Sequence, residues 1–117
     1  MNNPPPEPPI FTRTFDFLHW LIPQTKSFPK LFRTTYTQRL LDATLDFHEA
    51  IIEANSLRDR ARLAQLRQAD GYLDKVRSYL RLARRLDWLS EGQYEHASRM
   101  VAEIGRLLGG WIRVTNT

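Results

Sequence analysis

Cysteine is absent from the 117-residue sequence, and histidine occurs only three times. Without cysteine, disulfide bonds, thiolate nucleophiles and cysteine-ligated zinc sites are excluded. No apolar run approaches the roughly 20 residues that a membrane-spanning helix needs. Residues 1–9 lack the charged start and apolar stretch of a secretion signal. We therefore expect a soluble, cytoplasmic protein that does not contact a membrane.

Residues that could perform catalysis are also scarce. His48 and Glu49 begin a zinc-protease motif, but Ile52 stands where the second histidine belongs. A carboxylate-bridged metal pair in a helical bundle uses two Glu-x-x-His motifs, and only Asp16 with His19 resembles one of them. No glycine-rich phosphate loop is present. We expect no catalytic residue, no metal site and no cofactor, and therefore no enzyme.

Arginine dominates the charged residues that are present. Lysine and arginine outnumber aspartate and glutamate by 17 to 13, which gives a formal net charge of +4, and only three of the 17 are lysines. The planar arginine fork suits phosphate and carboxylate groups. This composition favours an acidic partner, either a nucleic acid or an acidic protein surface.

Five prolines between residues 4 and 9 predict an extended segment that cannot supply donors to a backbone ladder. The rest of the chain has the length of one globular domain, and the sequence is 42% hydrophobic and 26% charged. We therefore expect a flexible proline-rich tail over residues 1–9 and a single domain over residues 10–117.

Apolar residues recur every three or four positions in four segments, which is the period of a helix packed on one face. The first segment starts at Ile10, and Pro23 predicts a kink or an end. The residues predicted to face the core are Phe11, Phe15, Leu18 and Ile22; Leu40, Thr44, Phe47, Ile51 and Ala54; Leu66, Ala69, Leu73, Val76, Leu80 and Ala83; and Tyr94, Ala97, Val101, Ile104, Leu108 and Trp111. The predicted fold is all-α, an antiparallel up-down four-helix bundle.

Polar residues indicate where the later helices begin and which side of the second helix faces outward. Three pairs have the spacing of N-terminal caps: Thr35 with Gln38, Ser56 with Asp59, and Ser90 with Gln93. The outer face of the second helix carries an acidic stripe, formed by Asp42, Asp46, Glu49 and Glu53. Trp88 precedes the fourth helix, and we expect it to have a structural role.

The third helical segment has an unusual charge. Between Leu57 and Leu86 there are nine basic residues and three acidic ones, a local excess of six. The arginines predicted to contact nucleic-acid phosphates are Arg60, Arg67, Arg77, Arg81, Arg84 and Arg85. Each neutralised phosphate releases counterions, so binding of this kind weakens as salt rises.

A structural interpretation of the same arginines remains open. Asp74 can pair with Arg77 one turn further on. The other arginines can cover the bundle, or meet the acidic stripe of the second helix in the same or a neighbouring subunit. Gly105 and Gly109, four residues apart, are expected to let another helix approach closely.

The sequence resembles a known family over nearly everything from the first helix onward. Residues 93–98 (QYEHAS) and 103–111 (EIGRLLGGW) resemble the ending of the accessory variability determinant (Avd) proteins of diversity-generating retroelements. Shorter similar stretches are residues 20–23 (WLIP), Phe28-Pro29, residues 53–55 (EAN) with Arg58-Asp59, and residues 80–83 (LRLA). Tyr36-Thr37-Gln38 departs from the family's glycine-containing version of that turn, and the proline-rich tail lies outside the resemblance.

The resemblance implies a non-catalytic four-helix bundle that assembles into a homopentameric barrel with a basic surface. It also implies two partners, the retroelement reverse transcriptase and nucleic acid, the latter being template RNA and also DNA. Together they support mutagenic copying of a template RNA into a variable gene. The alternative is a related four-helix bundle protein of the ribosomal RNA intervening-sequence type, with a structural or interaction role and no reverse transcriptase.

Overall fold

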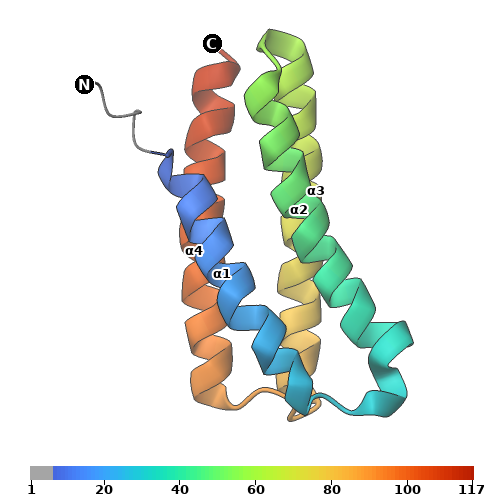
Figure 1. The fold of residues 1–117 in the computed structure, drawn as a ribbon. Helices are drawn as coiled ribbons and strands as arrows, with labels where there is room; N and C mark the ends of the chain where they lie inside the picture. The colour runs from blue at the N-terminus through green and yellow to red at the C-terminus, as the bar shows by residue number, and fades with distance from the viewer. Residues whose placement is uncertain (1–6) are drawn as a thin grey trace, which may run out of the picture.

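The computed structural model describes residues 7–117, in which helices are the only regular elements. Four long helices run alternately in opposite directions (Figure 1), and they are α1 (Pro9–Gln24), α2 (Gln38–Ser56), α3 (Asp59–Arg85) and α4 (Glu91–Thr115). This confirms the predicted all-α fold with four helices. None of the described helices has the length and apolar character to cross a membrane.

The predicted tail and the first helix meet near Pro9. Residues 1–6 of the tail lie outside the described residues. Pro8 precedes α1 and Pro9 begins it, at a position where the missing N–H would have no helical partner. Pro23 lies in the last turn, so the helix ends one residue after the expected break.

The core between the helices follows the predicted apolar stripes of α2, α3 and α4 closely. Every residue predicted to face the core from α2 and α3 is buried. In α4 the four central positions are buried, whereas Tyr94 and Trp111 are half-buried against the core. Two threonines within the core, Thr14 and Thr44, donate their hydroxyls to the carbonyls four residues earlier, which leaves no unsatisfied hydroxyl there.

The face predicted for α1 is wrong in part. Phe15 and Ile22 are 64% and 45% exposed. Phe17 and Leu21 are buried instead, so the helix is rotated relative to the prediction. Apolar residues occur on both sides of this helix, and two overlapping stripes therefore satisfy the same period.

Two of the three predicted caps do not form. A π-helical turn (Arg33–Thr37) continues directly into α2, and its Arg33 carbonyl accepts from the Gln38 N–H, so Thr35 caps nothing. Ser56 ends α2 and donates its hydroxyl to the Glu53 carbonyl. The residue that precedes α3 is Arg58, which makes no side-chain cap.

The third cap is confirmed. The Ser90 hydroxyl accepts from the Gln93 N–H, and the Gln93 side chain accepts from the Ser90 N–H, which is a reciprocal capping box. Leu89 precedes this cap and is buried. The start of α4 is therefore fixed by local hydrogen bonds and by the burial of Leu89.

The α3–α4 loop and the α1–α2 connector meet at one end of the bundle (Figure 1). Asp87 adopts φ 61°, and the Trp88 N–H then donates to the Ala83 carbonyl at 2.9 Å, which closes α3 with a Schellman motif. The Trp88 ring packs against three aromatic rings of the connector, those of Phe28, Phe32 and Tyr36. Trp88 therefore has the structural role expected of it.

Candidate nucleic-acid interface

Helix α3 presents two flanks of different chemistry. Gln65, Gln68 and Tyr72 line a groove between α3 and α2. On the other flank, Arg77 and Arg81 line a pocket of about 170 Å³ between α3 and α4, whose other residues include Tyr94 and Ser98 of α4. The α4 side of α3 therefore carries arginines, whereas the α2 side carries neutral polar side chains and one cation, Lys75, which lines a groove with Asp42 and Asp46 of α2.

Gly105 of α4 makes room for one of these arginines. A Cβ atom built at Gly105 would lie 2.5 Å from Nη2 of Arg77, so any larger residue would displace the guanidinium. We expected Gly105 and Gly109 to admit another helix, but the atom closest to this position belongs to the Arg77 side chain. Glycine here allows the guanidinium of Arg77 to lie against the surface of α4.

Two of the six predicted arginines form ion pairs within α3 and its loop. Arg77 pairs with Asp74 at 2.7 Å, as predicted, and Arg84 pairs with Asp87 at 3.1 Å. The acidic side chains are 70% and 87% exposed. Exposed pairs of this kind contribute about 0 to 1 kcal/mol, so a phosphate can compete for either arginine at little cost.

The other four predicted arginines have no ion-pair partner among residues 7–117, and they are Arg60, Arg67, Arg81 and Arg85. All four are exposed. By helical spacing, Arg60, Arg67 and Arg85 point further from the core than Arg77, Arg81 and Arg84 do. The six arginines therefore form a band on α3 that extends from the α4 flank to the outer surface.

A second row of arginines was missed from the sequence. Arg99, Arg106 and Arg113 of α4 are spaced seven residues apart, and all are exposed. Seven residues are close to two helical turns, so the three side chains leave the same outer face of α4. None has an ion-pair partner in the described part of the chain. The seven-residue spacing is only a weak signal for such a row, because one arginine in every seven residues is ordinary on an exposed helix face.

The α3 and α4 arginines lie on neighbouring helices, because α3 and α4 pack against each other along their length. The α3 band and the α4 row are therefore treated together as the arginine face, which comprises Arg60, Arg67, Arg77, Arg81, Arg84, Arg85, Arg99, Arg106 and Arg113. Cations in two adjacent rows can follow a phosphate backbone.

The acidic stripe of α2 lies on a different side of the molecule. Asp46, Glu49 and Glu53 line the groove toward α3 together with Gln65, which donates to Glu53 at 2.6 Å. No carboxylate of the stripe pairs with a cation among residues 7–117. Pairing of this stripe with the predicted arginines within one subunit, one alternative left open by the sequence, therefore does not occur.

Arg62 of α3 has a structural role. Its Nε and Nη2 atoms donate to the carbonyls of Ala54 and Asn55 at the end of α2, at 3.0 and 3.2 Å. Its guanidinium carbon also lies 5.7 Å from the centre of the Trp111 ring. These contacts hold the α2–α3 turn against α4, so Arg62 is not part of the arginine face.

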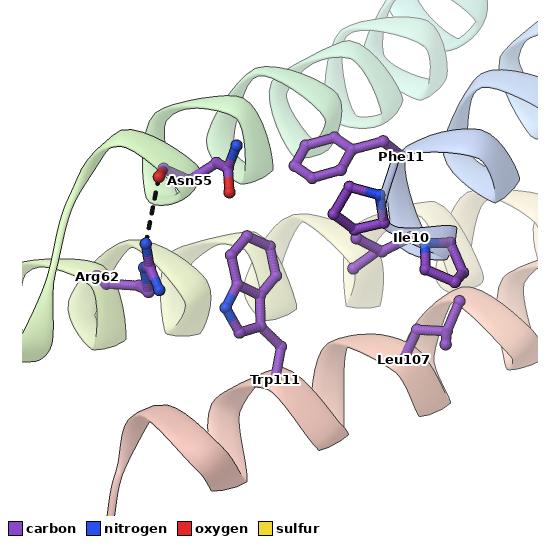
Figure 2. A pocket seen from close by; sticks show the side chains of 8 residues that line it. Ile10, Phe11, Asn55, Arg62, Leu107 and Trp111 are labelled. Carbon is purple, nitrogen blue, oxygen red and sulfur yellow. Dashed lines mark hydrogen bonds between the residues drawn. The ribbon is translucent and has the colours of Figure 1, made fainter. Parts of the chain in front are cut away.

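Arg62 and Trp111 also border a pocket of about 250 Å³ at the end of the bundle where α1 begins and α4 finishes. Trp111 projects from α4 into the space between Arg62 and the first residues of α1 (Figure 2). The other walls include Ile10, Phe11 and Leu107. Among the described residues that line this pocket, Arg62 is the only charged one, and it already donates to backbone carbonyls.

No group of three or more histidine, aspartate or glutamate residues in residues 7–117 is placed to hold a metal ion. Among the surfaces of the described residues, the arginine face is the one richest in exposed cations. Its chemistry is that of an anion-binding surface: exposed guanidinium groups, a shallow pocket and no buried reactive group.

The comparisons with known proteins fit this fold. A crystal structure of a protein of unknown function from the S23 ribosomal protein family, from Bacteroides thetaiotaomicron, superposes with a TM-score of 0.79 at 19% identity, covering 89% of this chain and 95% of that chain. No curated protein matches. The model of the bAvd-like family matches residues 10–115, nearly the whole described chain. The chain therefore belongs to the bAvd-like family.

Proposed function

We propose that the protein is a non-catalytic accessory factor that binds nucleic acid through the arginine face. The observation that carries this proposal is the concentration of exposed arginines, mostly without ion-pair partners, on the adjacent surfaces of α3 and α4. Phosphate contacts of this kind provide affinity without reading base sequence. The expected ligand is therefore a structured RNA, with DNA as a second substrate.

The proposed protein partner is the reverse transcriptase of a diversity-generating retroelement. Membership of the bAvd-like family supports this assignment. In this role the protein holds template RNA close to the polymerase and so supports mutagenic copying into a variable gene. Because the chain supplies binding surfaces and no catalytic constellation, the chemistry would belong to the polymerase.

The proposed assembly is a homopentamer. A ring needs two different complementary faces on each subunit, because every interface is head-to-tail. One available face carries exposed apolar side chains of α1 and α2, and we call it the α1–α2 apolar face; its residues are Phe15, Ile22, Leu45 and Ile52. The acidic stripe of α2 offers charge that a neighbouring subunit's basic residues could meet.

A second candidate is favoured by the shared fold with the S23 ribosomal protein family. Here the protein would be a structural bundle of the ribosomal RNA intervening-sequence type, without a reverse transcriptase. A reverse-transcriptase reading frame beside the gene favours the first proposal, and its absence favours this one.

The test is the affinity for a structured RNA measured across a salt series. We expect the wild type to lose affinity steeply as salt rises. The variant Arg77→Ala/Arg81→Ala/Arg84→Ala should bind more weakly with a shallower slope, since each phosphate contact contributes about 0.9 to that slope. This variant should remain folded, because the three arginine side chains lie outside the buried core.

A control variant removes the same number of positive charges from a different surface. Lys30→Ala/Arg33→Ala/Arg39→Ala neutralises three exposed cations outside the arginine face. This control variant should retain most of the wild-type affinity for RNA and most of its salt dependence. Equal losses in the two variants would show that net charge alone governs binding, and absence of binding by the wild type at low salt would reject the nucleic-acid proposal.

A further inference from the structure

The end of the bundle formed by the α1–α2 connector and the α3–α4 loop exposes apolar side chains. Leu31 is 82% exposed, Phe32 41% and Leu86 44%. Phe32 stacks on Trp88 with ring centres 5.4 Å apart, which joins the connector to the loop. These residues lie at the end of the bundle where α3 finishes, next to Arg84 and Arg85 of the arginine face.

The connector beside this patch carries only positive charge. The sequence from residue 17 to residue 41 contains no acidic residue, and it carries the cations Lys26, Lys30, Arg33 and Arg39. The first three of these flank Leu31 and Phe32 along the connector, and all are exposed. The adjoining loop and the start of α4 add two carboxylates, that of Asp87, which pairs with Arg84, and that of Glu91. We call this surface the connector patch; it comprises Lys26, Lys30, Leu31, Phe32, Arg33, Leu86 and Trp88.

We propose that the connector patch docks a protein surface that presents carboxylates around apolar side chains. Exposed apolar residues at an end of the molecule indicate an interaction site, and the surrounding cations determine the charge of the partner. Two of the three exposed apolar residues are leucines, which cannot stack on bases as aromatic rings do. The patch therefore fits a protein better than a nucleic acid.

This inference rests on the proposed function, because the partner that the proposal supplies is the reverse transcriptase. It assigns two roles to adjoining surfaces: the arginine face holds nucleic acid, and the connector patch, which begins beside Arg85 at Leu86, holds the polymerase. The two surfaces can then be occupied together, as delivery of an RNA template requires.

The test uses the reverse transcriptase encoded with this protein and measures its affinity for purified full-length variants. Leu31→Ser and Lys30→Glu/Arg33→Glu should each weaken binding about tenfold or more, since an interface anchor or a reversed charge pair commonly has an effect of that size. Val114→Ser removes a 68% exposed apolar side chain from α4 and serves as the matched control, with unchanged affinity. All these positions are exposed, so the fold should be retained.

Leu31→Ser should also leave RNA affinity unchanged, whereas Arg77→Ala/Arg81→Ala/Arg84→Ala should weaken RNA binding and spare the polymerase. Wild-type affinity for the polymerase in both patch variants would overturn the docking assignment alone. A parallel loss of RNA binding in Leu31→Ser would make the patch part of the nucleic-acid surface instead. Binding to phosphatidylserine vesicles is measured in parallel. If the patch variants lose vesicle binding but keep the wild-type affinity for the polymerase, the patch docks on a membrane surface instead. Failure of the wild type to bind the polymerase would reject that partner and this docking proposal together.

Discussion

At the scale of single residues, Tyr36 shows how the connector is tied to the bundle. Its hydroxyl donates to the backbone carbonyl of Tyr79 in α3, and its ring lies edge-on to Trp88 and Tyr79. Burial raises the pKa of the Tyr36 hydroxyl well above its usual range, and the nearby Tyr79 adds to that effect. One side chain thus fixes the π-helical turn against α3.

The raised pKa of Tyr36 makes stability depend on alkaline pH. A folded-state pKa above the unfolded value gives a contribution that is complete below the unfolded tyrosine pKa of about 10 and is lost as pH rises above it. We expect the free energy of unfolding, measured with urea, to fall above that pH in the wild type. The fall should be smaller in Tyr36→Phe, which should also cost about 0.5 to 1.5 kcal/mol at neutral pH for the lost hydrogen bond.

Tyr94→Phe provides a control for this measurement, because it removes a half-buried hydroxyl on α4 that has no part in the connector. If the free energy of unfolding falls equally with rising alkaline pH in the wild type and in Tyr36→Phe, the pH dependence does not come from Tyr36.

At the scale of elements, the helices differ in how well the sequence predicted them. In α3 one unbroken apolar stripe, which includes Leu66, Leu73 and Leu80, identifies the buried face, and Leu82, 43% exposed, is the exception outside it. In α1, Phe15 and Phe17 lie on opposite sides, and only the position of the neighbouring helices determines which is buried. The apolar period alone identified the buried face of α3, but it did not identify that of α1.

The ends of the helices also differ in how well the sequence predicted them. The Ser90 capping box is a local device, and its spacing predicted it. The π-helical turn before α2 depends on tertiary contacts of Tyr36 with Tyr79 and Trp88, which spacing does not encode. The α3 arginines were predictable because their density is unusual. The α4 row was not, because one arginine in every seven residues is ordinary for an exposed helix face.

The α1–α2 apolar face leads to a prediction about assembly. The Phe15 ring lies against His48, whose Nδ1 is buried without a hydrogen-bond partner among the described residues. We expect Phe15→Ser/Ile52→Ser to raise the subunit dissociation constant about tenfold or more, since these exposed side chains would be buried between subunits. Sedimentation equilibrium measures the mass of the assembly directly.

Val114→Ser, also exposed but on α4, should leave that mass unchanged. A wild type that sediments as a monomer would contradict the proposed pentamer. A Phe15→Ser/Ile52→Ser variant with the wild-type mass would place the interface on another face.

At the scale of the whole molecule, charge is unevenly distributed, although Asp70 and Asp74 lie among the α3 arginines and Lys75 lies beside the acidic stripe of α2. The carboxylates of α2 lie along one side, the arginine face covers α3 and α4, and the connector patch occupies one end. With a formal net charge of +4, the molecule as a whole attracts anions only modestly. The uneven distribution matters more than the total, because it places the positive potential where a phosphate backbone can follow two helices.

The claim that binding uses both helices is tested most directly by neutralising the α4 row alone. We predict that Arg99→Ala/Arg106→Ala/Arg113→Ala lowers affinity for a structured RNA and reduces the salt slope, as Arg77→Ala/Arg81→Ala/Arg84→Ala does. Lys30→Ala/Arg33→Ala/Arg39→Ala, with the same loss of charge, should retain the wild-type slope. An α4-row variant that binds RNA with the affinity and slope of the wild type would contradict the account, because the arginine face would then be confined to α3.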